Sequence, residues 1–105
     1  MEEIAWRKIA ALALNRRVGR NQVALGSGAG FALIKLRPRG ADVTIYRWTL
    51  RFEDGAIVDL SVNCLEEGKE SRALTIAGRR LRSVAVDYEI RNPSWGRRLE
   101  IWAQS

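Results

Sequence analysis

The chain has 105 residues, of which 47% are hydrophobic, so it can bury a core without the disulfides that much smaller domains need. Its formal net charge is +6, from 18 lysines and arginines against 12 acidic residues, and it has no histidine and one cysteine. These counts exclude an intramolecular disulfide, histidine-based catalysis and a zinc site of the usual cysteine and histidine kind. We therefore expect a single domain over residues 1–105 that uses no metal and no cofactor.

The segment Ile4–Leu14 fits two structures. As a strand it places Trp6, Leu12 and Leu14 on one face, with Lys8 as the exception. As a helix it benefits from the high propensity of its alanine-rich centre. We favour the strand because the sequence that follows alternates as strands do.

The next part of the chain contains turns and short strands. A basic loop over Asn15–Asn21 leads into a short strand at Gln22–Leu25. The alternate glycines of Gly26–Gly30 would suit a phosphate-binding loop, but such a loop must open a long helix. The segment before the next proline, Phe31–Arg37, is too short for that helix. We expect a turn between strands instead, with the second strand broken at Pro38–Gly40.

Val43–Phe52 is the longest predicted strand and is rich in β-branched and aromatic residues. Its alternation directs one row toward the core: Tyr46, Trp48, Leu50 and Phe52. Asp54-Gly55 follows, which is the best short-range hairpin signal in the chain. On the return strand the inward row is Ala56, Val58, Leu60 and Val62. Asp59 points outward, where it can pair with one of three residues of the first strand: Arg47, Thr49 or Arg51.

The stretch Ser71–Arg91 reads as two strands joined by a turn at Gly78. The second of these strands directs one row inward: Val84, Val86, Tyr88 and Ile90. The last strand, Arg97–Ala103, has Leu99, Ile101 and Ala103 on one face and Arg98, Glu100 and Trp102 on the other. The sequence therefore predicts an all-β fold, an antiparallel two-sheet β-sandwich of jelly-roll type with about eight strands.

A series of short motifs occurs in a fixed order between Trp6 and Trp102, over most of the chain. They are Val18-Gly19-Arg20, the strand with Phe31, Ile34 and Leu36, the Asp54-Gly55 turn, Gly68 before Ser71-Arg72, Leu74 with Gly78 and Arg80, and Val84 with Tyr88. This order resembles a family of small bacterial β-sandwich domains of unknown function, many of them in exported or envelope proteins. The resemblance implies an envelope or periplasmic location, no established activity, and structural roles beside turns for Arg72 and Arg80.

The N-terminal sequence bears on that location. Met1-Glu2-Glu3 lacks the basic region of a signal peptide, so the sequence as it stands predicts none. No apolar run approaches the ~20 residues of a membrane span.

Two acidic residues could in principle support catalysis. Asp87 and Glu89 share a strand face about 7 Å apart, which is within the range of paired glycosidase carboxylates. Their alternation with small and polar residues is more typical of a solvent face. Cys64 ends an apolar row, and no histidine is present to lower its pKa, so we expect a buried, inert thiol. The sequence therefore predicts that the protein is not an enzyme.

The basic residues are the remaining candidates for a site. They form three clusters: Arg79, Arg80 and Arg82 at one turn, Arg97 and Arg98 after Trp95, and Arg16, Arg17 and Arg20 near the start. Guanidinium groups near aromatic rings suit phosphate backbones, sulfated sugars and stacked bases. We predict that the ligand-binding residues are two arginine pairs and a loop tryptophan: Arg79, Arg82, Arg97, Arg98 and Trp95. The two pairs form one patch only if the topology brings them together, because a simple meander places them at opposite ends of the strand Ser83–Arg91.

These observations predict a binding or interaction module. Its expected partner is a polyanion, such as a glycan, lipid headgroups or nucleic acid. The alternative is a structural subunit that self-associates into a homo-oligomer through edge strands. The charge alone also fits a soluble arginine-rich surface, since the arginines are scattered along the chain.

Overall fold

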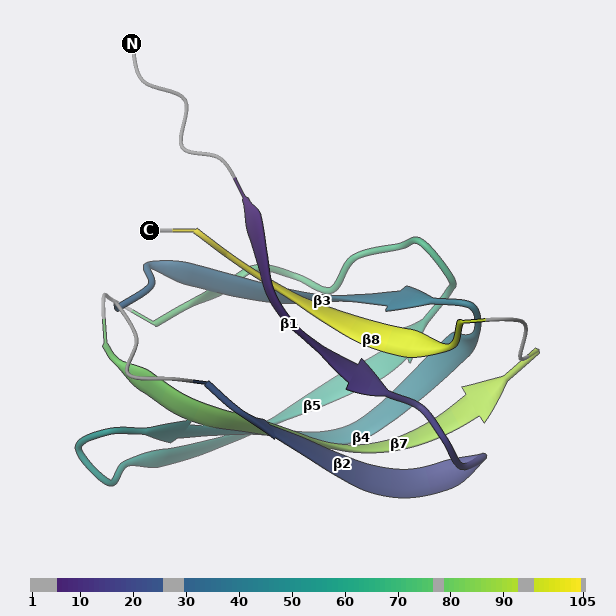
Figure 1. The fold of residues 1–105 in the computed structure, drawn as a ribbon, viewed down its shortest axis with the longest axis horizontal. Coiled ribbons are helices and arrows are strands. Elements are labelled where there is room, and N and C mark those ends of the chain that lie inside the picture. The colour runs from purple at the N-terminus through teal and green to yellow at the C-terminus, as the bar shows by residue number, and fades with distance from the viewer. Residues whose placement is uncertain (1–5, 26–29, 77–78, 93–95, 105) are drawn as a thin grey trace, which may run out of the picture.

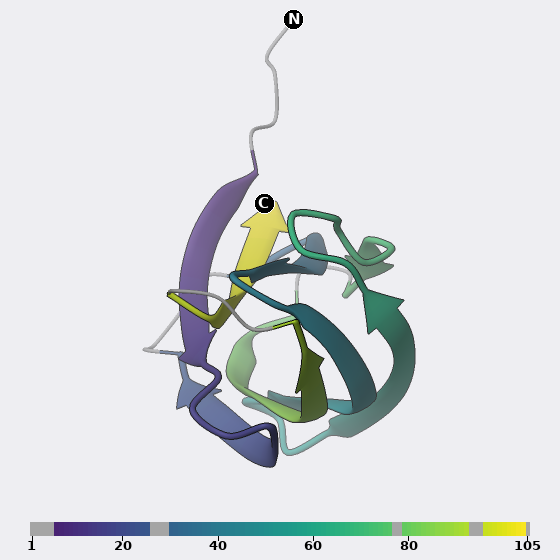
Figure 2. The same cartoon turned by 90° about the vertical axis from the view of Figure 1, so that its right-hand side faces the viewer.

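The computed structural model describes residues 6–25, 30–76, 79–92 and 96–104, which form eight strands in two antiparallel sheets. Sheet A has the order β1-β8-β3-β6, formed by Arg7–Ala13, Arg98–Gln104, Leu33–Arg39 and Leu74–Thr75. Sheet B has the order β2-β7-β4-β5, formed by Val18–Ala24, Leu81–Arg91, Asp42–Phe52 and Ile57–Leu65. Figure 1 shows the two sheets as stacked layers, and Figure 2 shows the same sandwich turned by 90°.

The topology is centred on the turn between β4 and β5. Gly55 adopts a φ of 90°, which favours glycine, and the Asp54 carboxylate accepts a hydrogen bond from the Ala56 N–H at 2.9 Å. Moving outward from this turn, each strand pairs with its counterpart on the other side: β3 with β6, β2 with β7 and β1 with β8. A long hairpin wrapped in this way is a jelly roll, so the predicted fold class is confirmed.

The N-terminal segment is a strand, as favoured from the sequence. β1 pairs with β8, and its register shifts between Lys8 and Ala10, where one extra residue forms a β-bulge. Because a bulge reverses the alternation, Lys8 points out while Leu12 and Leu14 are buried. The bulge also puts Trp6 on the outer face with Lys8, where Lys35 Nζ lies 4.0 Å from the centre of the Trp6 ring, so the prediction that Trp6 shares a face with Leu12 and Leu14 is wrong.

A second bulge makes one prediction about the core wrong. Tyr46 was expected in the inward row of β4, but it is 55% exposed. The register of β4 against β7 shifts between Ile45 and Arg47, so Tyr46 is the extra residue of a β-bulge and lies opposite no residue of β7. Ile45 takes the inward place before the bulge, and Trp48, Leu50 and Phe52 take it after.

Two predicted strand limits are also wrong. β2 begins at Val18, within the expected loop, because each of its residues pairs with β7. β3 continues through Pro38 to Arg39, and the break comes at Gly40, where φ is 74°. The Pro38 carbonyl accepts from the Gly68 N–H at 2.9 Å, on the side of β3 away from β8. The missing N–H of proline faces the same side, so the pairing with β8 loses no hydrogen bond.

The two strands predicted within Ser71–Arg91 do not pair with each other. β6 contains two residues and pairs with β3 in sheet A, whereas β7 lies in sheet B. The cause is the jelly-roll wrapping, in which successive strands cross between the sheets. The expected turns at Gly26–Gly30 and Gly78 fall largely or wholly outside the described residues.

The core lies between the sheets and is supplied by the rows that alternation predicts on β7 and β8. Val84, Val86, Tyr88 and Ile90 are buried, and so are Leu99, Ile101 and Ala103. On the outer face of sheet B, Thr49 Oγ1 donates to Asp59 at 2.6 Å, so Asp59 pairs with one of the three expected partners. Glu100 is only 2% exposed although it lies on the outer face of β8. Cys64, predicted to be buried, is exposed, because the register of β5 against β4 shifts by one residue between Val62 and Cys64 and reverses the alternation.

Candidate anion-binding pocket

The structure separates the two predicted arginine pairs. Arg79 and Arg82 lie at the start of β7, and Arg97 and Arg98 follow its other end. β7 has eleven residues and at about 3.3 Å per residue spans about 33 Å, so the two pairs lie at opposite ends of the sandwich. They therefore do not form one patch. Trp95 lies outside the described residues.

Arg79 is held by contacts with the β4–β5 turn. Its guanidinium stacks over the Phe52 ring at 3.9 Å and lies 3.5 Å from the Asp54 carboxylate. The hydrogen bond from the Ala56 N–H is the main reason that the pKa of Asp54 lies below its ordinary value, and the nearby Arg79 guanidinium lowers it further. These contacts give Arg79 a role in supporting the β4–β5 turn. Arg82 is exposed at a register shift between β4 and β7.

At the opposite end of the sandwich, three arginines from separate segments meet. Arg17 belongs to the β1–β2 connection, Arg91 ends β7, and Arg97 precedes β8. They line a pocket of about 610 Å³ together with Glu89, Ile90 and Asn92. We call this the basic end pocket. It lies where β7 ends and β8 begins, at the end of the sandwich that faces the viewer in Figure 2.

Backbone hydrogen bonds fix the three segments relative to one another. The Ile90 N–H donates to the Arg17 carbonyl at 2.7 Å, and the Leu14 N–H donates to the Arg97 carbonyl at 3.4 Å. The pairing of β2 with β7 and of β1 with β8 makes these contacts possible. The convergence of the arginines is therefore a consequence of jelly-roll topology, which alternation along the chain does not reveal.

The acidic residues near the basic end pocket already have partners. Glu89 accepts a hydrogen bond from the Tyr46 hydroxyl at 2.5 Å, and this bond raises the pKa of Tyr46. Asp42 accepts from the Glu67 N–H at 2.9 Å and from the Asn92 amide at 3.0 Å. These two bonds, in that order of importance, hold the pKa of Asp42 below its ordinary value. Both carboxylates thus stabilise the strand ends around the pocket.

The guanidiniums of the basic end pocket have no partner among the described residues. Within the described residues, the side chains of Arg17, Arg91 and Arg97 form no ion pair or hydrogen bond. Arg17 and Arg91 are exposed and Arg97 is half-buried. Three planar cations with free donors around one concave surface match the oxygens of a phosphate, sulfate or carboxylate.

A second basic region covers the outer face of sheet A, but a buried acid neutralises much of it. Glu100 accepts hydrogen bonds from Arg98 Nε and Trp102 Nε1, both at 3.2 Å. Lys8 and Arg39 form ion pairs with the same carboxylate at 3.7 and 3.5 Å. We call these five residues the Glu100 cluster. Arg98, a predicted ligand-binding residue, is therefore occupied within it.

The electrostatics of the Glu100 cluster fit a structural role. Burial alone raises the pKa of Glu100, but the Trp102 N–H and then the Arg98 and Arg39 guanidiniums outweigh it and lower the pKa. Register explains the arrangement, because Arg39 lies opposite Arg98 and Arg37 lies opposite Glu100 on neighbouring strands. The alternation of β3 and β8 indicates which of these side chains point outward. It does not indicate that strands so far apart in sequence are neighbours.

Comparison with known proteins identifies no relative: no protein-family model, curated protein or solved structure matches the chain. The resemblance to the bacterial β-sandwich family therefore stays a prediction. In the described ranges, no cluster of three or more acidic or cysteine side chains could hold a metal. No helix in those ranges is long and apolar enough to cross a membrane.

Proposed function

We propose that the protein is a non-catalytic binding module that recognises a polyanion through its phosphate or sulfate groups. The observation that carries this proposal is the convergence at the basic end pocket of three guanidiniums, those of Arg17, Arg91 and Arg97, which have no partner in the part of the chain that the structure describes. Arginine forms two parallel hydrogen bonds to such an oxyanion, and these are stronger than bonds between neutral groups. The net charge of +6 adds long-range attraction for the same partners.

The test compares two double variants of equal charge. Arg17→Gln/Arg91→Gln removes two exposed arginines of the basic end pocket. Arg80→Gln/Arg82→Gln removes two exposed arginines near the start of β7. Each variant lowers the net charge by 2, from +6 to +4, so a purely global effect of charge would weaken binding equally.

Binding is measured by fluorescence anisotropy with a labelled heparin fragment and with a short single-stranded oligonucleotide over a range of salt concentrations. We expect the wild type to lose affinity steeply with salt, because binding releases condensed counterions. In the basic end pocket variant the slope of log affinity against log salt should fall by about one for each arginine removed, and in the other variant it should be unchanged. The relative affinity for the two probes distinguishes sulfated glycan from nucleic acid. Equal losses in both variants would contradict the proposal.

A second function is supported by the two edges of sheet B. β2 and β5 are its outer strands, and each exposes a large apolar side chain, Val18 at 60% and Ile57 at 54%. Exposed edge strands can add to the sheet of another copy, and joining β2 of one copy to β5 of the next would extend without closing. Ile57→Lys should then reduce the apparent mass in size-exclusion chromatography with light scattering. If the wild-type protein already has the mass of a monomer, this function is ruled out.

A further inference from the structure

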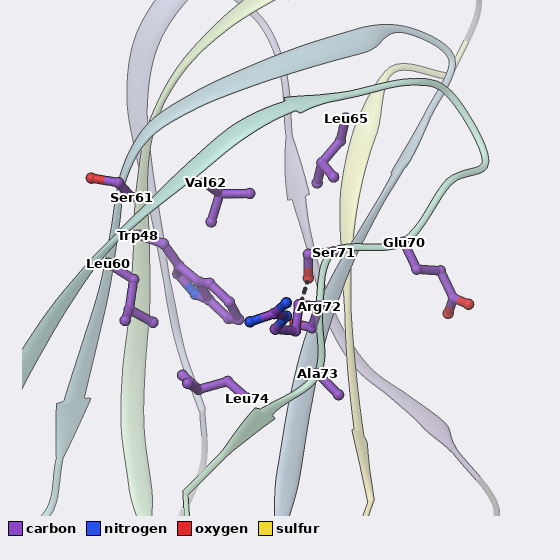
Figure 3. Close-up of a pocket in the computed structure, with 10 residues that line it drawn as sticks. All are labelled: Trp48, Leu60, Ser61, Val62, Leu65, Glu70, Ser71, Arg72, Ala73 and Leu74. Atoms are coloured by element: carbon purple, nitrogen blue, oxygen red, sulfur yellow. Dashed lines mark hydrogen bonds between the residues drawn. The ribbon is translucent and has the colours of Figure 1, made fainter.

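A second pocket opens at the side of the sandwich, between β5 and the segment that precedes β6. It has a volume of about 460 Å³, within the range of small-molecule sites. Its apolar wall is Trp48, Leu60, Val62, Leu65, Ala73 and Leu74, and its polar rim is Ser61, Glu70, Ser71 and Arg72. We call this the side pocket, and Figure 3 shows its lining.

The side pocket contains a buried hydrogen-bond donor without an acceptor. Trp48 is 2% exposed, and its indole N–H has no hydrogen-bond partner among the described residues. Leaving such a donor unsatisfied destabilises a folded protein, so most buried donors are paired. In Figure 3 the indole lies among the lining residues, with its nitrogen on the side of Leu60 and Leu74. The nitrogen has less than 1 Å² of accessible surface, so a ligand oxygen in this pocket supplies the missing acceptor once the Leu60 or Leu74 side chain beside the nitrogen moves aside.

The charge of the side pocket comes from Arg72. In Figure 3 its guanidinium points toward the indole, whereas the Glu70 carboxylate points away from it. Glu70 forms an ion pair with Lys35 at 2.5 Å, and the described residues offer the Arg72 guanidinium no ion pair or hydrogen bond. The pocket therefore combines an aliphatic wall with an unpaired cation.

The segment that carries Arg72 is firmly attached to sheet A. The Leu36 N–H donates to Ser71 Oγ and the Ser71 N–H donates to the Leu36 carbonyl, both at 2.8 Å. This pair of bonds fixes the backbone next to Arg72 without using its side chain. A pocket with a fixed rim loses little conformational entropy when a ligand binds.

We propose that the side pocket binds a small acyl carboxylate that carries a hydroxyl or keto oxygen on its chain. Its carboxylate pairs with Arg72, its chain packs against the leucine and valine wall, and its second oxygen accepts the Trp48 N–H. This site uses none of the residues of the basic end pocket, so either proposal can fail while the other stands.

The test follows the indole N–H signals of ¹⁵N-labelled protein by NMR during titration with 3-hydroxyoctanoate, octanoate and octylammonium. The chain has four tryptophans, and the signal that disappears in Trp48→Phe is that of Trp48. We expect 3-hydroxyoctanoate to move the Trp48 signal and to bind more tightly than octanoate, and octylammonium to leave the spectrum unchanged.

Two arginine variants make this test specific. Arg72→Gln removes an exposed charge at the rim and should weaken binding of 3-hydroxyoctanoate about tenfold, as expected for loss of a charged hydrogen bond. Arg80→Gln removes an equal charge outside the side pocket and should leave the affinity unchanged. An unmoved Trp48 signal, or equal affinity in the two variants, would overturn the proposal.

Discussion

Glu100 shows how one residue can organise a surface. It lies on the outward face of β8, yet its side chain is only 3% exposed because the long side chains around it cover it. Lys8, Arg39 and Arg98 come from three strands and share this one carboxylate. The acid therefore joins β1, β8 and β3 on the side of sheet A that faces away from the core.

Glu100→Gln should lower the free energy of unfolding by about 1–3 kcal/mol at neutral pH, because hydrogen bonds to a charged group are lost in a buried place. The native pKa of Glu100 lies below its ordinary value of 4.5. The carboxylate therefore stabilises the fold above that value, and this contribution is lost as the pH falls through the native pKa. The difference between wild type and variant should shrink below about pH 4.5.

Urea unfolding at a series of pH values measures this difference. Glu66→Gln is the control, since Glu66 is exposed and has no salt bridge within the described residues. A Glu100 effect that stays constant down to acidic pH would show that the carboxylate charge is not its source.

Two aromatic residues of β4 differ in burial although alternation places them in one row. Trp48→Ala should lower the free energy of unfolding by about 3–5 kcal/mol, because it removes a large side chain from the core. Tyr46→Ala should cost far less, since Tyr46 is 55% exposed and contributes one hydrogen bond to Glu89. Thermal unfolding of both variants measures the contrast, and similar losses would contradict the outward position that the bulge gives Tyr46.

At the scale of the elements, local signals were sufficient for some strands and not for others. The Asp54-Gly55 hairpin and the inward rows of β7 and β8 could be predicted because their patterns lie within a few consecutive residues. Tyr46 was misplaced because a bulge depends on the register with a neighbouring strand, which the sequence of β4 alone does not contain. From the sequence Pro38 predicts a break, because only the pairing with β8 on one side shows that the side lacking an N–H needs no partner strand.

The bulge in β4 makes a prediction about deletions. Removing Tyr46 would leave Ile45, Arg47 and Trp48 in regular alternation, with both apolar residues still directed inward. Removing Thr49, which lies in a regular part of β4, would instead reverse the facing of one half of the strand. We expect the Tyr46 deletion to keep a cooperative thermal transition and the Thr49 deletion to abolish it. Circular dichroism of the two purified proteins measures this, and equal loss of the transition would contradict the bulge argument.

At the scale of the whole molecule, the candidate site depends on topology more than on motif. Arg97 could be named from the sequence because it lies in an arginine pair beside a loop. Arg91 is not a candidate from the sequence, and Arg17 is one only as part of the basic loop near the start, because the convergence of both with Arg97 requires β1 to pair with β8 and β2 with β7. Arg79 and Arg82 were separated from the site by the length of β7. Alternation along a strand predicts which face of the sheet a side chain occupies. The neighbours of that side chain depend on the pairing of strands that are far apart in the sequence.

An anion that binds the basic end pocket of the native state should also stabilise the whole fold, because it has no comparable site on the unfolded chain. Once sulfate exceeds its dissociation constant about tenfold, linkage predicts a gain of about 1.4 kcal/mol, or roughly 5–10 °C in Tm for a domain of this size. Sulfate also stabilises proteins generally through exclusion from their surface, and that effect acts on every variant alike.

The comparison that isolates the specific gain is the shift in Tm between sulfate and chloride at equal ionic strength. In Arg17→Gln/Arg91→Gln we expect the Tm shift to fall to the value that surface exclusion of sulfate produces alone, because the pocket loses two of its three guanidiniums. In Arg80→Gln/Arg82→Gln, which has the same net charge, the full shift should remain. If all three proteins shift equally, sulfate acts only through the solvent, and the convergence of arginines at this end of the sandwich creates no anion site.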